Sequence, residues 1–299
     1  MVCIEVKEVN VVQDLSDKAN LLIQALPYIQ KFNKETIVIK YGGNAMVHPL
    51  LKDAVIKDIV LLSLVGINIV VVHGGGPDIN DMLAKIQKES RFIDGLRYTD
   101  QETMDIVQQV LCGKVNKNLV SLINRVGGKA VGLCGMDGGM ICGVQLKKQD
   151  KDYGLVGEIV NINPEVVNDT LDKGYIPVIS SVAQGIDGNS VYNINADTAA
   201  AKLSVALGAI KLILLTDVRG IMNNVDDNDS LISQITLEGI PLLKERNIIS
   251  GGMIPKVDCC VEALNGGVER THIIDGRIAH SILIELLSDE GIGTMITKG

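Results

Sequence analysis

The sequence contains very few aromatic residues. Its 299 residues include no tryptophan, two phenylalanines and six tyrosines. Proteins that bind single-stranded nucleic acids stack bases on aromatic side chains and carry basic surfaces. This chain instead has a formal net charge of −8, from 36 acidic residues against 28 basic ones. The composition therefore argues against a nucleic-acid partner.

Membrane, export and metal signals are also missing. No apolar run reaches the roughly 20 residues of a membrane-spanning helix, and the first ten residues lack the basic start and apolar stretch of a secretory signal. None of the six cysteines forms a C-x-x-C pair, and no two of the four histidines have metal-ligand spacing. We therefore expect reduced thiols, no metal site built from side chains, no membrane partner and a cytoplasmic protein. We expect His73 to pack at a strand end, and His48 and His280 to lie on the surface.

Short apolar runs alternate with longer amphipathic ones along the chain. This alternation predicts a largely parallel sheet that is covered by helices on both faces. The expected strands are 35–40, 67–72, 129–133, 175–180, 211–216 and 271–275. The expected helices are 50–64, 77–88, 100–125, 164–173, 196–207 and 256–265. Residues 140–162 break the rhythm with two strand-like runs around a polar turn, which predicts a hairpin.

Glycine-rich turns follow several of the predicted strands. They are Gly42–Gly43, Gly74–Gly76 and Gly251–Gly252, and Lys40 and Lys256 lie beside two of them. Ligands of parallel sheets bind at the carboxyl ends of the strands, where glycine lets backbone N–H groups approach an anion closely. Neither common nucleotide motif fits, because Ile79 occupies the last position of G-x-G-x-x-G and no G-x-x-x-x-G-K-[ST] occurs. The turns predict a phosphate-type site on a different fold.

Ordered motifs over nearly the whole chain identify a family. The sequence resembles the amino-acid kinase family in VIKYGGNAM, VVVHGGGP, DGLRYTD, GKVNKNLV, GYIPVIS, NINADTAA, LLTDVRGI, GGMIPKV, HIIDGR and GIGTMI. The resemblance implies an α/β fold, a three-layer α/β/α sandwich with a mainly parallel central sheet and two lobes. Residues 34–186 would bind the amino acid and form a dimer, and residues 187–299 would bind ATP. We expect the hinge between the lobes near residues 185–192.

The same resemblance implies a reaction. The γ-phosphoryl group of ATP, carried with Mg²⁺, would be transferred to the side-chain carboxylate of N-acetyl-L-glutamate. Such a reaction needs positioning and fixed positive charge, and no general base, because the acceptor carboxylate is already ionised. Lys40 and Lys256 would stabilise the transition state, although either one alone would read as an ordinary exposed lysine. Asp197 would orient both lysines, and it could also cap the helix that follows it.

The remaining site residues are assigned from the family's motifs. The resemblance implies that Arg97 binds the α-carboxylate of the substrate, for which a planar guanidinium is suited. Asn193 would bind the same end of the substrate, unless it only forms a turn at a strand end. The backbone N–H groups of the glycine turn would meet the reacting carboxylate, and a side chain there would block the approach. These assignments comprise Gly74, Gly75, Gly76, Arg97 and Asn193 for the substrate, and Gly42, Gly43, Thr216 and Asp217 for the nucleotide.

Two other functions stay open at this stage. A sister kinase of the same fold could act on carbamate, aspartate, glutamate or UMP, although "GLR" together with "NINAD" favours acetylglutamate. A non-catalytic amino-acid sensor could also keep the fold, but it would not need Lys40, Lys256 and Asp197.

Residues 1–33 lie ahead of the predicted sheet and suggest regulation. Apolar residues recur there at helical spacing, namely Val12, Leu15, Ala19, Leu22, Leu26 and Ile29. In the family, such a helix accompanies arginine-inhibited enzymes and joins dimers into a hexamer, a trimer of dimers; alternatively, it packs on its own subunit. The C-terminal segment resembles the arginine site of those enzymes, with His272 and Glu285 at matching positions and Tyr28 as one residue that could close the site. We therefore expect L-arginine as an inhibitor.

Overall fold

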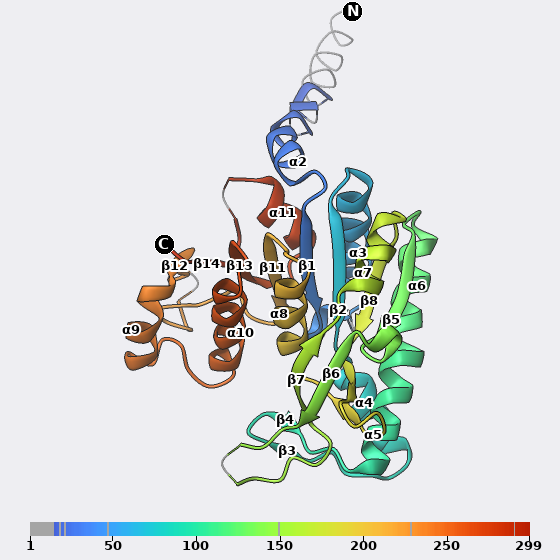
Figure 1. Cartoon of the computed structure of the whole chain (residues 1–299). Coiled ribbons are helices and arrows are strands. Elements are labelled where there is room, and N and C mark those ends of the chain that lie inside the picture. The colour runs from blue at the N-terminus through green and yellow to red at the C-terminus, as the bar shows by residue number, and fades with distance from the viewer. Residues whose placement is uncertain are drawn as a thin grey trace, which may run out of the picture.

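The central sheet of the protein is mainly parallel. The computed structural model describes residues 15–17, 19–20, 22–46, 48–148, 150–227, 229–289 and 291–299. Eight strands of this part form one sheet, in the order β12-β14-β13-β11-β1-β2-β8-β5, and only β13 and β14 pair antiparallel (Figure 1). Their bounds are β1 (Thr36–Tyr41), β2 (Asn68–His73), β5 (Ala130–Cys134), β8 (Ile176–Ser180), β11 (Lys211–Thr216), β12 (Gln234–Thr236), β13 (Arg270–Asp275) and β14 (Thr294–Thr297).

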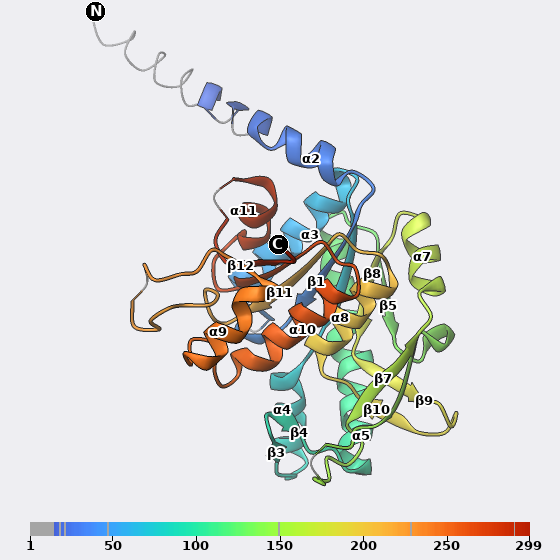
Figure 2. The same cartoon turned by 60° about the vertical axis from the view of Figure 1, so that its left-hand side comes forward.

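Helices cover both faces of this sheet, so the predicted three-layer sandwich is confirmed (Figure 2). One face carries α7 (Glu165–Asp172), α8 (Ala196–Ala206) and α10 (Met253–Asn265). The other carries α3 (Pro49–Leu64), α6 (Asn116–Arg125) and α11 (Ser281–Leu287). Two shorter helices complete the main elements, α4 (Gly76–Lys85) and α9 (Ile240–Glu245).

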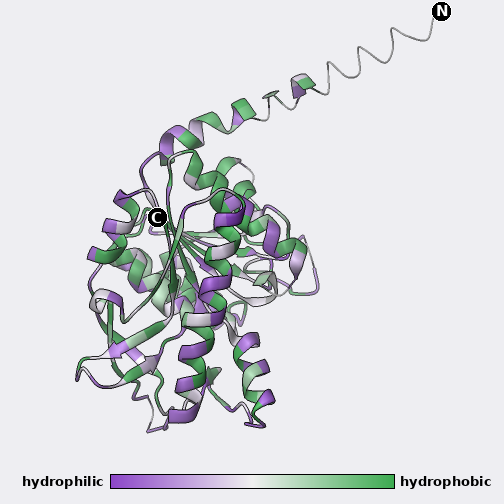
Figure 3. Ribbon diagram, turned by 90° about the vertical axis from the view of Figure 1, so that its right-hand side faces the viewer, coloured by the Kyte–Doolittle hydropathy of each residue, from purple (hydrophilic) through white to green (hydrophobic). Residues whose placement is uncertain are grey.

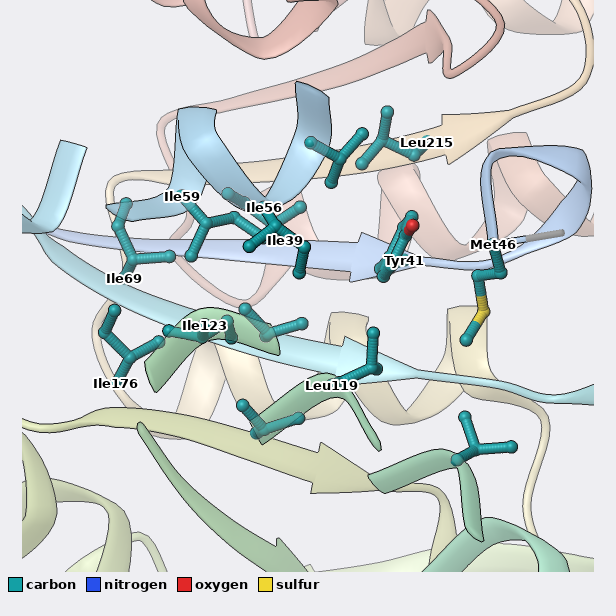
Figure 4. Packing of buried hydrophobic residues seen from close by; sticks show 14 of the residues in the cluster. Ile39, Tyr41, Met46, Ile56, Ile59, Ile69, Leu119, Ile123, Ile176 and Leu215 are labelled. Atoms are coloured by element: carbon teal, nitrogen blue, oxygen red, sulfur yellow. The ribbon is translucent and has the colours of Figure 1, made fainter. Parts of the chain in front are cut away.

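The alternation of side chains along β1 divides the core in two. Ile37, Ile39 and Tyr41 pack into the cluster under α3, α6 and α11, whereas Val38 packs into the cluster under α8 and α10. Figure 4 shows Ile39 and Tyr41 among side chains of the first cluster. Between them, the two clusters bury every apolar residue of β1. This is why the strand reads as a continuous apolar run in the sequence. In Figure 3 the central strands are coloured mainly as hydrophobic.

A smaller sheet confirms the predicted hairpin. β6 (Ile141–Gln145) and β7 (Gly157–Ile162) pair antiparallel. They join β9 (Val182–Gly185) and β10 (Val191–Asn193), which flank the segment expected to be a hinge. The structure places that segment at the tip of a hairpin, and the division into two lobes stays a prediction. A second hairpin, of β3 (Phe92–Ile93) and β4 (Leu96–Arg97), lies near the tip of α4 and α5 (Figure 1).

The helix predicted over 100–125 is one helical run with an irregular middle. It comprises α5 (Gln101–Gln108), a π-helical segment (Gln109–Val115) and α6. Asp100 caps the start by accepting a hydrogen bond of 2.8 Å from the backbone N–H of Thr103. A π turn contains one residue more than an α turn and occurs frequently at functional sites.

The described residues between 15 and 25 extend away from the sandwich (Figures 1 and 2). They are followed by α2 (Leu26–Phe32), of which Phe32 is buried in the core. Leu15, Leu22 and Ile23 are 59%, 75% and 66% exposed, so these residues do not pack on their own subunit. Val12 lies outside the described residues.

Other expectations concern cysteines, histidines and membranes. The five described cysteines are free, and Cys134, Cys259 and Cys260 are buried while Cys112 and Cys142 are half-buried; Cys3 lies outside the described residues. His73 is buried at the end of β2, and His48 and His280 are exposed, as predicted. Among the described residues, no helix is long and apolar enough to cross a membrane.

Candidate active site

Two lysines and one aspartate meet at the carboxyl ends of the central strands. Lys40, on β1, lies with its Nζ 2.9 Å from Oδ1 of Asp197. Lys256, on α10, donates a hydrogen bond of 2.7 Å to Oδ2 of the same carboxylate. The three residues are far apart in the sequence, and their side chains are only 11% to 25% exposed. The structure therefore brings together the three predicted catalytic residues.

Electrostatics keep this group ionised. Burial alone would raise the pKa of Asp197, but the charges of Lys40 and Lys256 outweigh burial and lower this pKa to about 2. The carboxylate therefore carries its charge at neutral pH and balances one of the two cations. Within this group of three residues, one positive charge is left uncompensated, which suits an anionic ligand.

The capping role predicted for Asp197 is wrong. Asn195 is the N-cap of α8, and its side-chain oxygen accepts hydrogen bonds from the backbone N–H groups of Asp197 (2.9 Å) and Thr198 (3.1 Å). The Asp197 side chain is thereby free to reach the lysines. The negative charge in the first turn of α8 is also favoured by the helix dipole.

A cavity of about 430 Å³ opens on one side of the lysines. Lys40 and Lys256 line it together with Gly43, Thr216 and Asp217, as predicted for the nucleotide; Gly42 does not line it. Sequence reasoning did not assign the apolar part of the wall, because its residues come from separate segments and apolar side chains carry no chemical signature of a site. That part consists of Leu215, Val218, Ile221, Met222, Val225, Ile248 and Met253.

The glycine turn after β1 is packed closely against this cavity. Gly43 has φ +70°, and a Cβ there would lie 2.7 Å from the carboxylate of Asp217. A Cβ at Gly42 would lie 2.9 Å from Nζ of Lys40. The Thr216 hydroxyl donates to the backbone oxygen of Val218 at 2.9 Å, so it shapes the turn after β11. The positive φ and the nearby carboxylate explain glycine at Gly43 before any ligand is considered, whereas at Gly42 a Cβ would meet only the flexible end of the Lys40 side chain.

A second cavity, of about 170 Å³, contains the residues predicted for the substrate. Gly74, Gly75, Gly76, Arg97 and Asn193 all line it. Arg97 is 8% exposed and donates hydrogen bonds to Ser90 Oγ and to the backbone oxygen of Gly76, the latter at 3.3 Å. Burial lowers the pKa of its guanidinium. Among the described residues, no carboxylate lies within salt-bridge distance of Arg97, so this buried cation is available to an anionic ligand.

The structure corrects the reason given for one glycine. A Cβ at Gly75 would lie 2.7 Å from Cδ2 of Leu111 and 3.1 Å from Cγ2 of Val115, both in the π-helical segment. Glycine is therefore required there by the protein's own packing. A Cβ at Gly76 would meet no described atom within 4 Å outside its chain neighbours, so packing does not require glycine at this position.

Asn193 both ends a strand and faces the cavity. It is the last residue of β10, and its side-chain amide donates to Thr99 Oγ1 at 3.2 Å. The cavity wall also includes residues that sequence reasoning missed, namely Ile79, Phe92, Leu96, Leu111, Val156, Ser181 and Ile194. Most of them are apolar and carry no chemical signature, so only their position in the fold reveals them.

A third cavity, of about 270 Å³, lies between α2 and the end of the chain. His272 and Glu285 meet there, with Nδ1 of His272 2.6 Å from Oε1 of Glu285, and Tyr28 and Lys211 also line the wall. Nζ of Lys211 donates to Nε2 of His272 at 2.9 Å, so the ring is neutral and its Nδ1–H donates to Glu285. Burial lowers the pKa of His272, in agreement with this state. Sequence reasoning missed Lys211, which lies at the start of an apolar strand.

The sandwich carries the Lys40–Asp197–Lys256 cluster at the carboxyl ends of its strands, and comparison with known proteins identifies the family. A model of the amino acid kinase family matches residues 35–275, and the chain belongs to this family. The most similar relatives include the acetylglutamate kinase of Clostridium kluyveri, 59% identical over 94% of this chain and 99% of the relative. Those of Clostridium beijerinckii and Heliobacterium modesticaldum are 57% and 56% identical, each over 94% of this chain and 98% of the relative.

Solved structures agree with the fold. The N-acetylglutamate synthase of Neisseria gonorrhoeae, solved with coenzyme A and N-acetyl-glutamate, matches with a TM-score of 0.82 at 26% identity. The match covers 94% of this chain and 63% of that one. Carbamate kinase from Giardia lamblia, solved with AMP-PNP, matches with a TM-score of 0.63 at 18% identity over 89% of this chain and 99% of that one, which supports the fold alone.

Proposed function

We propose that this enzyme transfers the γ-phosphoryl group of ATP to the side-chain carboxylate of N-acetyl-L-glutamate, giving an acyl phosphate and ADP as the second step of arginine biosynthesis. One observation carries the proposal: Asp197 holds Lys40 and Lys256 together where both lysines border the cavity of about 430 Å³. The high identity to acetylglutamate kinases over nearly the whole chain supports the choice of acceptor.

The chemistry follows from charge. The acceptor carboxylate and the phosphoryl group repel each other, and negative charge spreads over the phosphoryl oxygens in the transition state. Lys40 and Lys256 provide fixed positive charge there, and Asp197 fixes the positions of both ammonium groups. The carboxylate oxygen attacks phosphorus, and the bond to the bridging oxygen of ADP breaks. No proton has to be removed from the attacking group.

The two cavities suit the two substrates. ATP would occupy the cavity lined by Gly43, Thr216 and Asp217, with the apolar wall beside its base. Mg²⁺ would arrive on the phosphates of ATP. In the smaller cavity, Arg97 would pair with the α-carboxylate, and the N–H groups of the glycine turn would face the reacting carboxylate.

An ADP-release assay with a panel of acceptors tests the proposal. N-acetyl-L-glutamate, L-glutamate, L-aspartate, carbamate and UMP are supplied one at a time with ATP and Mg²⁺. We expect rapid release only with N-acetyl-L-glutamate, and trapping by hydroxylamine should reveal the acyl phosphate. Rapid release with another acceptor would assign the chain to a sister kinase, and no release with any of them would favour a sensor.

We further propose that L-arginine inhibits the enzyme and that the N-terminal helix joins dimers into a hexamer in the cytoplasm. The supporting observation is the cavity shared by Tyr28, His272 and Glu285, into which the helix contributes residues. The exposed apolar residues Leu15, Leu22 and Ile23 also need a partner, and a second copy of the same helix is a suitable one. Glu285 already accepts from His272, Ile292 and Gly293, so a guanidinium would share or displace these bonds.

A further inference from the structure

We infer that His73 is a positioning residue, which orients the Gly74–Gly75 peptide so that the Gly75 N–H faces the acceptor carboxylate. This inference rests on the proposed function, because it assigns a task within the same substrate cavity. His73 is the last residue of β2 and is fully buried, directly before the glycine turn. Its ring contacts the backbone on one side and the helical run 101–125 on the other.

The hydrogen bonds of Asn116 determine which nitrogen of His73 carries the proton. The Asn116 Nδ2 lies 2.8 Å from the backbone oxygen of Val178 and 3.2 Å from that of Leu133. Because both of these groups only accept, the amide nitrogen must face them and cannot be exchanged with Oδ1. The same Nδ2 lies 3.1 Å from Nε2 of His73. The two protons of Nδ2 serve three acceptors, so one is donated to Val178 and the other is shared between Leu133 and Nε2. An amide nitrogen cannot accept a hydrogen bond, so Nε2 carries no proton and the proton of the neutral ring is on Nδ1.

The protonated nitrogen faces the turn. Nδ1 of His73 lies 2.8 Å from the backbone oxygen of Gly74, so the ring donates to this carbonyl. In a trans peptide the C=O and the following N–H point in opposite directions. Holding the Gly74 oxygen toward the ring thus turns the Gly75 N–H away from it. Among the described residues this N–H has no acceptor, whereas the Gly74 N–H is bonded to Tyr41.

The π-helical segment positions the groups around the turn: the apolar side chains that pack against Gly75, and Asn116, which contacts His73. Leu111 and Val115 from this segment pack against the α-carbon of Gly75, and Asn116 follows directly at the start of α6. Without its own hydrogen bond, a glycine peptide is free to rotate, because no side chain restricts it. The contacts with Leu111 and Val115 therefore limit the position of the turn. His73 determines the orientation of the Gly74–Gly75 peptide group. Histidine suits this task because it donates to the turn while accepting from Asn116.

Burial keeps the ring in this state. It lowers the pKa of His73 to about 4, an effect that the hydrogen bond to Gly74 opposes and the nearby charge of Lys117 reinforces. The ring is therefore neutral at the pH at which the enzyme works. It takes no proton from the reaction and acts only through the glycine backbone.

Two substitutions separate positioning from packing. His73→Phe keeps an aromatic ring, although a somewhat larger one, and removes the donor, and His73→Asn restores an amide nitrogen near the place of Nδ1. We expect His73→Phe to weaken N-acetyl-L-glutamate binding about tenfold or more in calorimetry, because the Gly75 N–H would no longer be held toward the charged carboxylate, with ATP affinity changed less than about twofold. His73→Asn should recover most of the loss. The matched control is His48→Asn at an exposed site, which should bind both ligands as the parent chain does.

A purely structural role would predict otherwise. In that case His73→Phe would lower the unfolding temperature and yet bind N-acetyl-L-glutamate with unchanged affinity, which would overturn the inference. Equal losses of acetylglutamate and ATP affinity in a folded His73→Phe protein would overturn it as well.

Nitrogen NMR tests the tautomer without any ligand. With ¹⁵N-labelled histidine, we expect His73 to show a protonated Nδ1 and an unprotonated Nε2 that do not change between about pH 5.5 and 8, as a neutral buried ring requires. A proton on Nε2, or titration near pH 6.5, would overturn the inference even if His73→Phe failed to fold. If the parent chain did not bind N-acetyl-L-glutamate while the NMR result held, the proposed function would fail and the orientation of the turn would stand.

Discussion

Lys256 donates a hydrogen bond of 2.7 Å to Asp197, a residue 59 positions away in the sequence. The two residues lie near the starts of α10 and α8, which pack side by side on one face of the sheet. Asp197 also pairs with Lys40 on β1, so one carboxylate links a strand to two helices. The positions of both ammonium groups therefore depend on how α8 and α10 pack against the sheet.

Loss of Lys256 should affect the chemical step. We expect Lys256→Ala to lower kcat about a thousandfold with little change in either KM, because fixed charge opposite a developing anion acts mainly in the transition state. Steady-state kinetics checks this. The control is Lys202→Ala, which removes an exposed lysine paired with Glu262 across α8 and α10 and should leave kcat unchanged. Turnover above about a tenth of the parent value would remove Lys256 from the mechanism.

Loss of the buried guanidinium should affect substrate binding. Arg97→Met keeps much of the side-chain length and removes the charge, so we expect KM for N-acetyl-L-glutamate to rise about a hundredfold, as loss of a charged bidentate partner implies. KM for ATP should stay the same. Arg91, which lies over the ring of Tyr98, provides the control as Arg91→Met. An unchanged KM in a folded Arg97→Met protein would contradict the assignment.

The two glycines of the turn should respond differently to a side chain. Gly75→Val would force atoms into Leu111 and Val115, so we expect a loss of stability of about 1–3 kcal/mol and weaker binding of both substrates. Gly76→Val meets open space apart from its chain neighbour Pro77, which disfavours helical backbone at a residue with a Cβ. It should therefore lower the unfolding temperature less than Gly75→Val does, while N-acetyl-L-glutamate binding is lost. Thermal unfolding with calorimetry separates the two. Full acetylglutamate affinity in Gly76→Val would show that the substrate does not approach this position.

The buried ring of His73 should make the protein less stable in acid. Its pKa is about 4 in the folded chain and near 6.5 in the unfolded one. Between these values the unfolded state binds one proton more than the folded state. The contribution of His73 to the free energy of unfolding is therefore fully present above pH 6.5 and falls by up to about 3 kcal/mol as the pH decreases toward 4. His73→Asn lacks this titration. Urea unfolding at pH 7.5, 6.0 and 4.5 should show a shallower pH dependence for His73→Asn, and equal slopes would contradict the prediction.

Arginine inhibition can be separated from the catalytic site. We expect millimolar L-arginine to slow the intact enzyme and a hexamer to be found by light scattering. A truncation that removes residues 1–24 keeps Tyr28 and the buried Phe32, and it should form dimers that respond less to arginine because the coupling between dimers is gone. An intact dimer that ignores arginine would contradict the proposal. A truncated chain that stays hexameric and fully inhibited would exclude the helix as the coupling element.

The sequence by itself determined the main strands and helices of the sandwich and their order, but not the short elements such as β12, β14 and α9. Apolar runs such as 67–72 and 211–216, which are short and alternate with amphipathic segments, indicate strands buried on two faces, and glycine pairs after some strands indicate turns at the carboxyl ends. The family motifs then assigned Lys40, Asp197 and Lys256, and the structure brings these three residues together. Such features are local, because each is written in a few consecutive residues.

Only the tertiary structure decided which groups contact one another. In the structure Asn195 caps α8, so the Asp197 side chain can bind the lysines. The structure also places Leu111 and Val115 against Gly75. It also joined Asn116 to His73 through a helix with a π turn. Periodicity says which face of an element is buried and does not say what it is buried against, since that depends on contacts between residues distant in the sequence.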